Sequence, residues 1–439
     1  MKLSRIGRLS MALVASVALG LSMTACGGGT VGYMWVAGTQ STATETSRIV
    51  GFKIDNYTGN LTAAPLSPYD SAGVHPVTLL VRPGGRFVYA INSGTTNGDG
   101  TSNHDGNISE FTVGGDGRLT FQANYVTQGN TPVWGSMDSS GSYLYVLDSL
   151  APAGSSYYSA GLGDITVFAI ASDTGRLSTV TNAQIKDEND QNLPYFPVGY
   201  QPTMTKITSG GCLFVLDKNQ ATDPHPTSIF PYTVSNGQLV QAINSQIQTQ
   251  ASNLSSINVG GGNGTGTTTG GSYVYATDIG PQDATNAPTT NGQIYAYTVG
   301  TNCSLNAVSS SPFANITPAQ SPVWAQSVTS GGQQFLYVLN QGSTSSAVTS
   351  SSVSLFSVDS TGKLTPFQDP ANPYSTGSGP TCMAVDPTNQ YLYTSNSVDG
   401  TVVGKVFNSR TGELAPLRRG QSFSAVTHAT CLAISNAVD

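Results

Sequence analysis

The stretch "GSGPTCMAVDPTNQYLYTSNSVDGTV", residues 377–402, contains two short apolar segments joined by a tight turn. Both segments are rich in Val, Leu, Tyr and Thr, and Gly, Pro, Asn and Asp bound them on either side. This pattern predicts a β-hairpin. A similar phrase, "THATCLAIS" (427–435), begins near the C-terminus but is followed only by "NAVD". We therefore expect the other strands of that last unit to come from elsewhere in the chain.

The same phrase recurs along most of the chain. It opens with a run that usually begins at Pro, passes through a small turn, and continues with a run that ends in Asn or Asp. A loop, a third run, a Gly turn and a shorter fourth run follow. The clearest first halves are "PVTLLVRPGGRFVYAIN" (76–92), "PVWGSMDSSGSYLYVLD" (132–148), "PTMTKITSGGCLFVLD" (202–217), "PVWAQSVTSGGQQFLYVLN" (322–340) and "PTCMAVDPTNQYLYTSN" (380–396). Four strands per unit with a period of roughly fifty residues are typical of a β-propeller.

The two chain ends complete each other. Near the N-terminus, "YMWVAGT" (33–39), "RIVGFKI" (48–54) and "LTAAPLS" (61–67) match the second, third and fourth strands of a unit, with no first strand before them. The C-terminal "ATCLAIS" (429–435) matches a first strand with nothing after it. We predict an all-β protein with a single seven-bladed β-propeller over residues 33–439. The C-terminal strand closes the ring against the N-terminal strands, so no sheet edge stays open.

Residues 1–25 have the features of a bacterial lipoprotein signal peptide. Lys2, Arg5 and Arg8 precede the apolar run "MALVASVALGL" (11–21), which is too short to span a bilayer comfortably. The following "SMTACGGG" (22–29) resembles a lipobox, which implies cleavage before Cys26 and lipidation of its thiol. An ordinary signal peptide with a chance cysteine is the alternative. We expect an exported, membrane-anchored lipoprotein facing the periplasm or the cell exterior, with residues 26–32 as its tether.

The charge pattern argues against a nucleic-acid partner. The formal net charge is −7, with 17 Lys and Arg and no basic cluster outside the first ten residues. Binding to phosphates needs concentrated Lys and Arg. The lipid membrane, reached through the acyl anchor on Cys26, is therefore the partner that the sequence itself indicates.

Strand order predicts which face carries the long loops. The first and third strands of each blade run from one face, here called the top, to the other, the bottom. The bottom turns are short ("PGG", "SSG", "GDG", "SNG"), whereas the top connections are long, as at 93–107, 149–163 and 186–201. Long loops on a rigid scaffold commonly carry binding sites. The six residues between Cys26 and Tyr33 span roughly 20 Å at most, so the bottom should face the membrane and the top should point away from it.

The repeat resembles the lactonase-like seven-bladed propellers, a family that includes one class of 6-phosphogluconolactonase and muconate cycloisomerase-like enzymes. The resemblance rests on phrases such as "GPTCMAVDPTNQYLYTSN" (379–396) with a following "STGKLTPF"-type turn, and it covers nearly all of residues 33–439. It implies an active centre in the top funnel, built from His, Arg and Glu at the starts of first strands and the ends of second strands. The matching positions here are mostly neutral.

Two imidazoles stand at the expected positions. His75 precedes Pro76, and His428 precedes Ala429 in the adjacent blade, so the two are weak candidates for an acid and base pair. Both could equally be polar residues of the channel mouth. The other rim positions, Thr131, Gln201 and Ser321, favour ligand binding over hydrolysis.

Aromatic residues gather on two top connections. Tyr195, Phe196 and Tyr200 lie in "LPYFPVGYQP" (193–202), and Tyr157 and Tyr158 lie in "SSYYSAG" (155–161). Exposed Tyr rings on stiff loops could stack on sugars or peptides; alternatively, these rings pack on one another and hold the loops down. Trp134 and Trp324, each third in its first strand, are expected in the core between blades.

Four cysteines remain in the predicted propeller. Cys382 and Cys431 share one register of neighbouring first strands, and Cys212 and Cys303 lie in bottom turns of adjacent blades. An exported protein permits both disulfides, but the sequence leaves the pairing open. No zinc-type spacing is present, and the loop with Asn97, Asp99, Asn103 and Asp105 lacks the closing Glu of a calcium site. We expect no metal and no cofactor.

Two functions follow from these patterns. The first is a non-catalytic, lipid-anchored binding scaffold that presents its top face to a glycan, peptide or protein. The second is a lactonase-type hydrolase acting on a sugar lactone in the central funnel. The lining of the funnel decides between them, because convergent His, Arg and Glu would favour hydrolysis.

Overall fold

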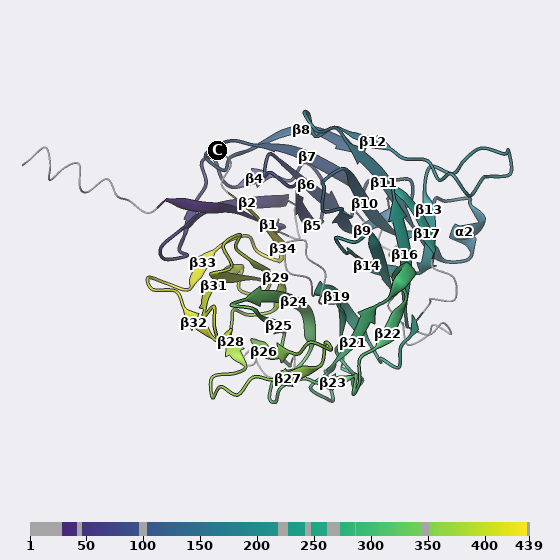
Figure 1. Ribbon diagram of the computed structural model, residues 1–439. Coiled ribbons are helices and arrows are strands. Elements are labelled where there is room, and N and C mark those ends of the chain that lie inside the picture. The colour runs from purple at the N-terminus through teal and green to yellow at the C-terminus, as the bar shows by residue number, and fades with distance from the viewer. Residues whose placement is uncertain are drawn as a thin grey trace, which may run out of the picture.

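The computed structural model describes residues 29–41, 46–95, 103–217, 227–241, 247–260, 273–285, 287–343 and 351–436. Within these ranges the strands form seven antiparallel sheets, six with five strands and one with four. The sheets stand like blades around a central axis (Figure 1), and we call the space between their inner strands the channel. The predicted seven-bladed propeller is confirmed. No helix among the described residues is long and apolar enough to cross a membrane.

Each blade repeats one strand order, which we call A to D from the channel outward. The inner A strands are β5 (Pro76–Val81), β9 (Asn130–Met137), β14 (Pro202–Ile207), β19 (Leu254–Gly260), β24 (Pro322–Ser330), β29 (Pro380–Val385) and β34 (Ala429–Asn436). The B strands are β6 (Phe87–Asn92), β10 (Tyr143–Leu150), β15 (Cys212–Asp217), β20 (Tyr273–Asp278), β25 (Gln333–Asn340), β30 (Tyr391–Asn396) and β1 (Thr30–Ser41).

The outer strands are less regular. The C strands are β7 (Asn107–Val113), β11 (Leu162–Ile170), β16 (Ser228–Ser235), β21 (Gln293–Val299), β26 (Ser352–Val358), β31 (Thr401–Phe407) and β2 (Thr46–Asp55). The D strands are β8 (Leu119–Tyr125), β12 (Leu177–Thr179), β17 (Gln238–Gln241), β22 (Leu305–Ala307), β27 (Leu364–Pro366), β32 (Leu414–Pro416) and β3 (Leu61–Ala63). In six blades a short fifth strand pairs with the C strand, next to D. These strands are β4 (Tyr69–Asp70), β13 (Phe196–Tyr200), β18 (Ile247–Gln248), β23 (Phe313–Ala314), β28 (Tyr374–Ser375) and β33 (Ser422–Ser424). One helical turn, α2 (Ser156–Ser159), and one 3₁₀ turn, η2 (Thr301–Cys303), complete the described elements.

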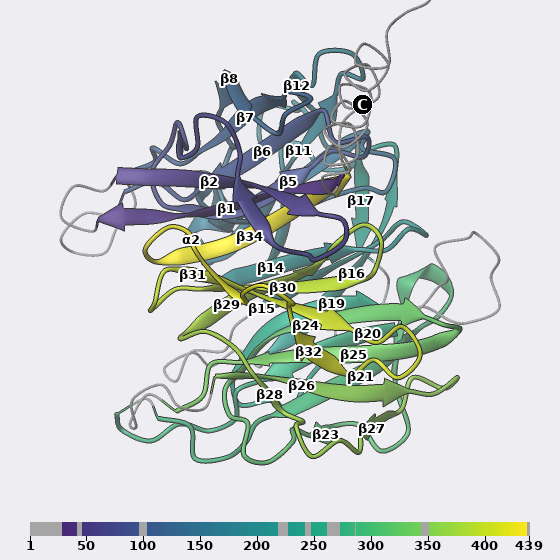
Figure 2. The same ribbon diagram turned by 90° about the vertical axis from the view of Figure 1, so that its left-hand side faces the viewer.

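Blade 1 joins the two ends of the chain, as predicted. Its strands follow the order β3-β2-β1-β34, and β1 pairs with β34 from Gly32 opposite Asn436 to Gly38 opposite Ala429. Figure 2 shows β34 beside β1, with β2 on the other side of β1. Blades 2 to 7 then follow in chain order, beginning with β5, β9, β14, β19, β24 and β29. β1 begins at Thr30, so the last residues of the expected tether already belong to the sheet.

A glycine–aromatic contact joins most neighbouring blades at the bottom face. Gly412 in the C–D turn of blade 7 has φ +76°, and a Cβ added there would lie 2.8 Å from the Phe335 ring of blade 6. Two residues after Phe335, the Tyr337 hydroxyl donates to the Gly412 carbonyl at 2.6 Å. The same turn glycine meets an aromatic ring of the preceding blade at Gly59, Gly117, Gly175, Gly237 and Gly362. The repeated aromatic pairs of the B strands therefore anchor one blade on the next.

Blades 4 and 5 are joined at the bottom by a disulfide instead. Cys303 occupies the turn position with φ +61°, and Cys212 stands at the B-strand position where the other blades have Phe or Tyr. Their sulfurs are bonded at 2.03 Å. A covalent bond thus replaces the glycine–aromatic contact at this blade boundary.

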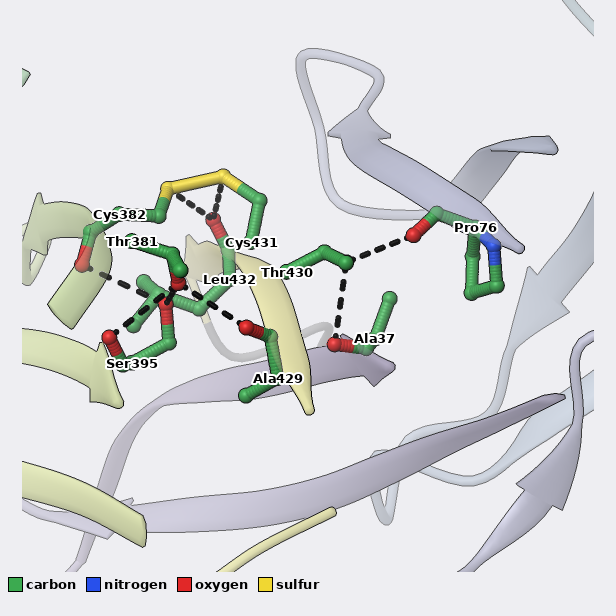
Figure 3. The surroundings of a disulfide bond; sticks show 9 residues. All are labelled: Ala37, Pro76, Thr381, Cys382, Ser395, Ala429, Thr430, Cys431 and Leu432. Atoms are coloured by element: carbon green, nitrogen blue, oxygen red, sulfur yellow. Dashed lines mark hydrogen bonds between the residues drawn. A yellow bond between two sulfur atoms is a disulfide. The ribbon is translucent and has the colours of Figure 1, made fainter. Parts of the chain in front are cut away.

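A second disulfide lies near the point where the ring closes. Cys382 of β29 and Cys431 of β34 are bonded at 2.04 Å, joining the inner strands of blades 7 and 1 (Figure 3). In the same region the Thr381 hydroxyl donates to the Ala429 carbonyl at 3.1 Å, and the Thr430 hydroxyl donates to the Pro76 carbonyl at 2.7 Å. The inner strands of blades 7, 1 and 2 are therefore tied together in sequence around the ring.

Candidate functional site

The rim of the channel at the top face consists of the residues that precede the inner strands, together with Thr131, the second residue of β9. They are His75, Thr131, Gln201, Asn253, Ser321, Gly379 and His428. At all of these except Asn253, φ lies between +41° and +62°. The first few residues of each inner strand also carry a register shift, as between Pro76 and Thr78. Such a register shift is typical of a β-bulge. A residue with positive φ beside the bulge redirects the chain into the strand, so the fold itself imposes this unusual backbone conformation.

His75 is held in one orientation. Its ring Nδ1 lies 2.9 Å from the Gly94 carbonyl, and its backbone N–H donates to the Ser47 hydroxyl at 3.0 Å. Because a carbonyl only accepts, a neutral His75 carries its hydrogen on Nδ1, which leaves Nε2 as the atom that can take a proton.

Asp105 supplies a carboxylate near His75, which the sequence did not indicate. Burial acts to raise the pKa of Asp105, but hydrogen bonds from Thr95 and the charge of His75 outweigh it, and the net pKa is lowered. Asp105 accepts from both the backbone and the hydroxyl of Thr95 at 2.7 Å. Asn97 and Asp99, which share a loop with Asp105, lie outside the described residues.

His428 differs from His75. Its side chain is exposed. The Thr430 hydroxyl bonds that link β34 to Pro76 of β5 place the two rim histidines at the starts of adjacent inner strands. The two histidines are therefore neighbours by position on the ring, and His75 is the one with a fixed ring orientation.

The other rim side chains are neutral and only partly accessible. Thr131 and Gln201 are half-buried, whereas Ser321 is 7% exposed. None of the seven rim positions within the described chain carries a carboxylate or a guanidinium. The His, Arg and Glu set implied by the family resemblance is not present at these strand starts.

The ends of the B strands carry acidic residues, but these are committed to the fold. Asp278 of blade 5 accepts backbone N–H groups from Ser252 and Asn253 at 3.1 and 2.7 Å. Asp217 of blade 4 accepts from the backbone of Tyr200 at 3.2 Å. These carboxylates tie the connection that precedes each inner strand to the end of the B strand of the same blade, so they are structural residues.

Blade 3 has two carboxylates at the top end of its B strand and the facing residue of its C strand, where the other blades have at most one. Asp148 at the end of β10 stands directly opposite Asp164 of β11, and both side chains are fully buried. The Thr127 hydroxyl donates to Asp148 Oδ1 at 2.8 Å, whereas Asp148 Oδ2 and Asp164 Oδ1 have no hydrogen-bond partner. Burial raises the pKa of both carboxyls, and the charge of Asp148 raises the pKa of Asp164 further.

The predicted aromatic recognition surface is largely wrong. Tyr195 and Phe196 are 5% and 2% exposed, and the Tyr195 ring packs edge-on against Tyr157 with centroids 6.3 Å apart. Tyr157 and Tyr200 are half-buried, and only Tyr158, at 38%, is exposed. The rings hold the top connections of blade 3 against its sheet because their apolar area is better buried than solvated.

The expectation that Trp134 and Trp324 lie between blades is also wrong. Trp134 belongs to blade 3 and Trp324 to blade 6, yet their ring centroids are 5.6 Å apart. Inner strands of blades 3 and 6 face each other across a seven-membered ring, so this contact spans the channel. In the strand register, Met204 and the Cys382–Cys431 disulfide stand at the level of the two indoles. The indoles and their neighbours therefore form the floor of the top funnel.

Lys206 is a channel residue that the sequence reasoning missed. Its ammonium lies 4.7 Å from the Trp324 ring centroid and 5.5 Å from that of Trp134. A lone Lys in the inner strand "PTMTKI" was the available signal. Within the described residues, no group of three or more His, Cys, Asp or Glu side chains is arranged to hold a metal ion.

The comparisons with known proteins agree with the seven-bladed propeller described above. The family model described as lactonase, 7-bladed beta-propeller, matches residues 34–192 and 285–433. A search of curated proteins found no match. Among solved structures, a proposed 6-phosphogluconolactonase from Bacteroides fragilis is 19% identical with a TM-score of 0.63, and the alignment covers 93% of this chain and 98% of that one. The periplasmic gluconolactonase PpgL from Pseudomonas aeruginosa is 16% identical with a TM-score of 0.62, covering 93% and 100%. At such identities the likeness extends to the fold alone.

Proposed function

This chain belongs to the lactonase family of seven-bladed β-propellers, and on that premise we propose that it is an exported, lipid-anchored protein that binds a hydroxyl-rich ligand, such as a glycan, at the top mouth of its channel. The observation that carries the proposal is the composition of the rim. Thr131, Gln201, Asn253 and Ser321 offer hydroxyl and amide groups, which donate to and accept from sugar hydroxyls.

The funnel floor supports the same ligand class. Trp134 is half-buried and Trp324 is 6% exposed, and their rings meet across the channel. Aromatic faces pack well against the apolar faces of sugar rings, and neighbouring polar groups then fix the orientation of the sugar.

Export and anchoring remain part of the proposal. The two disulfides support an oxidising compartment, because such bonds are rare in the reducing cytosol. Cys26 lies outside the described residues, and β1 runs upward from Thr30 at the bottom face. An acyl chain on Cys26 would hold the bottom toward the membrane and leave the rim free to meet a ligand.

Titration with neutral oligosaccharides, followed by calorimetry, tests the binding proposal. Replacing Gln201 with Ala should weaken an oligosaccharide that binds the mouth by about tenfold, through the loss of hydrogen bonds that the ligand otherwise makes. Tyr158→Ala changes an exposed residue of α2 and should leave the affinity unchanged. Equal affinities of the Gln201 variant and the wild type would place the ligand elsewhere and overturn this assignment of the rim.

Hydrolysis of a sugar lactone is the second candidate, and the geometry of His75 favours it. An imidazole with Nδ1 fixed on Gly94 and a carboxylate nearby can act as a general base on water through Nε2. A hydrolase of this kind should lose about 100-fold or more of its rate of glucono-δ-lactone opening in His75→Ala, measured above the spontaneous rate. His428→Ala serves as the matched rim control. A wild-type rate no greater than the spontaneous rate would exclude this second function for that substrate.

A further inference from the structure

Among the residues that the structure describes, the middle of the channel holds a positive charge without a counter-charge. Lys206 reaches in from blade 4, and its ammonium lies beside indoles from blades 3 and 6. The two ion pairs found among the described residues, Arg48–Asp70 and Lys186–Asp190, do not involve it. Burial alone, without any acidic neighbour, lowers the pKa of Lys206 to about 8.

The two indoles beside Lys206 add further donors. The indole Nε1 atoms of Trp134 and Trp324 are both buried and have no hydrogen-bond partner. An indole N–H and a lysine ammonium can only donate. A buried donor without an acceptor is destabilising, so an acceptor supplied by a ligand would stabilise the indole N–H groups as well as the ammonium.

We propose that the channel beneath the rim is a binding site for a carboxylate, held by Lys206 with the indole N–H groups of Trp134 and Trp324. A carboxylate carries the missing negative charge and two acceptor oxygens. The rotatable stem of Lys206 lets the ammonium move from the ring faces toward the anion. Lys206 and Trp134 are both half-buried, so their side chains remain partly accessible from the channel.

The site is not carried over from the family. Lys206 lies in residues 193–284, which separate the two segments matched by the family model. The inference shares the indoles of Trp134 and Trp324 with the glycan proposal, but it adds Lys206 and concerns a charged group instead of the hydroxyl-binding rim.

Sodium acetate, titrated into the purified protein at constant ionic strength, tests the site. Two of the three Trp residues lie in the channel, so intrinsic fluorescence reports on it directly. We expect a saturable response to acetate and none to acetamide, which has the same shape without the charge. Lys206→Met should weaken acetate binding at least about tenfold, since it removes the charge and keeps an apolar stem. Glucuronate, tested in parallel, shows whether the carboxylate can arrive on a sugar.

Lys405 provides a matched control. It is also buried and its pKa is lowered by burial, but it lies on the C strand β31 away from the channel. Lys405→Met should therefore leave acetate binding unchanged within about twofold. A non-saturable response to acetate, or equal binding by wild type and Lys206→Met, would overturn the proposal.

A second measurement does not depend on any variant folding. Acetate should bind the wild-type protein more weakly as the pH rises through about 8, because Lys206 then loses its proton. Affinity that stays constant across that range would contradict the site. Binding of acetate without any binding of neutral oligosaccharides would support the channel site and reject the rim proposal, so the two can fail separately.

Discussion

The buried pair Asp148 and Asp164 is the most unusual titratable feature in the described chain. Other blades place Asn92, Asn340 and Asn396 at the position of Asp148. The Asn92 amide there donates to Asn107 and Ser109 across the sheet at 2.8 and 3.0 Å. Blade 3 lacks this donor, and a single proton shared between the two carboxyls would satisfy both of their unpartnered oxygens.

This pair should make the stability of the protein depend on pH. Burial holds the pKa values of both carboxyls above their unfolded values of about 4. The folded state therefore binds more protons than the unfolded state above pH 4, and the free energy of unfolding should fall as the pH rises through that window. Asp148→Asn should raise the free energy of unfolding at pH 7 by about 1–3 kcal/mol and flatten this slope. Urea denaturation between pH 4 and pH 8 measures both effects.

Asp278→Asn is the control for that prediction. Asp278 holds the equivalent strand end in blade 5, but its carboxylate accepts several backbone N–H groups. An amide there loses acceptor capacity, so this variant should be less stable than the wild type. If Asp148→Asn destabilised the protein at pH 7 as well, the two carboxylates would not be in the strained, proton-sharing arrangement inferred here.

At the scale of the strands, one blade boundary differs from the others in how it is held. Most boundaries use a turn glycine against an aromatic ring, as at Gly412 and Phe335. Between blades 4 and 5 the disulfide of Cys212 and Cys303 takes the same place, across 91 residues of sequence. The local requirement is the same in both cases: the C–D turn must be fixed on the neighbouring B strand.

Removing this disulfide should lower the free energy of unfolding, and putting an aromatic contact in its place should raise it again. Cys212→Ala with Cys303→Ala should lower the free energy of unfolding by about 2–5 kcal/mol, the usual loss for a native disulfide. Cys212→Tyr with Cys303→Gly recreates the pair used at the other boundaries and should recover part of that loss. Thermal unfolding of the three proteins measures the difference. A tyrosine–glycine variant no more stable than the alanine variant would show that the two devices are not equivalent.

At the scale of the whole molecule, blade 1 both closes the ring and carries the end of the chain that leads to the proposed lipid anchor. β1 enters at the bottom face from Thr30 and pairs with β34, so any tether before it leaves from the bottom. We expect Cys26→Ser to move the protein from the membrane fraction to the soluble fraction, because the acyl anchor is lost. Fractionation followed by immunoblotting measures the distribution.

The fold of the Cys26→Ser protein should be unchanged, since the described propeller begins after this residue. Circular dichroism and the melting temperature provide that control. A protein that stayed with the membrane after this substitution would be held by another means, and the proposed orientation of its top face would lose its basis.

The sequence alone was enough to predict the ring and its closure. Short apolar runs, turn residues and a fixed period describe local strand and hairpin preferences, and a closed ring of such hairpins repeats the same local solution in every blade. The segments at the two chain ends each form part of a blade, so they had to share one sheet. The positions of His75, Thr131, Gln201, Ser321 and His428 at strand starts followed from the same repeat.

Which side chains face the channel was decided only by the tertiary structure. Trp134, Lys206 and Trp324 are far apart in sequence and belong to three different blades, so no local pattern brings them together. Likewise, the proline-rich segment with Tyr195 and Phe196 reads as an exposed loop, but β13 begins at Phe196 and pairs with β11, and both rings are buried. The repeat of the strands and the choice of turn residues depend on residues that are near neighbours in the chain. Burial, and the approach of side chains from different blades across the ring, depend on how all seven blades are packed.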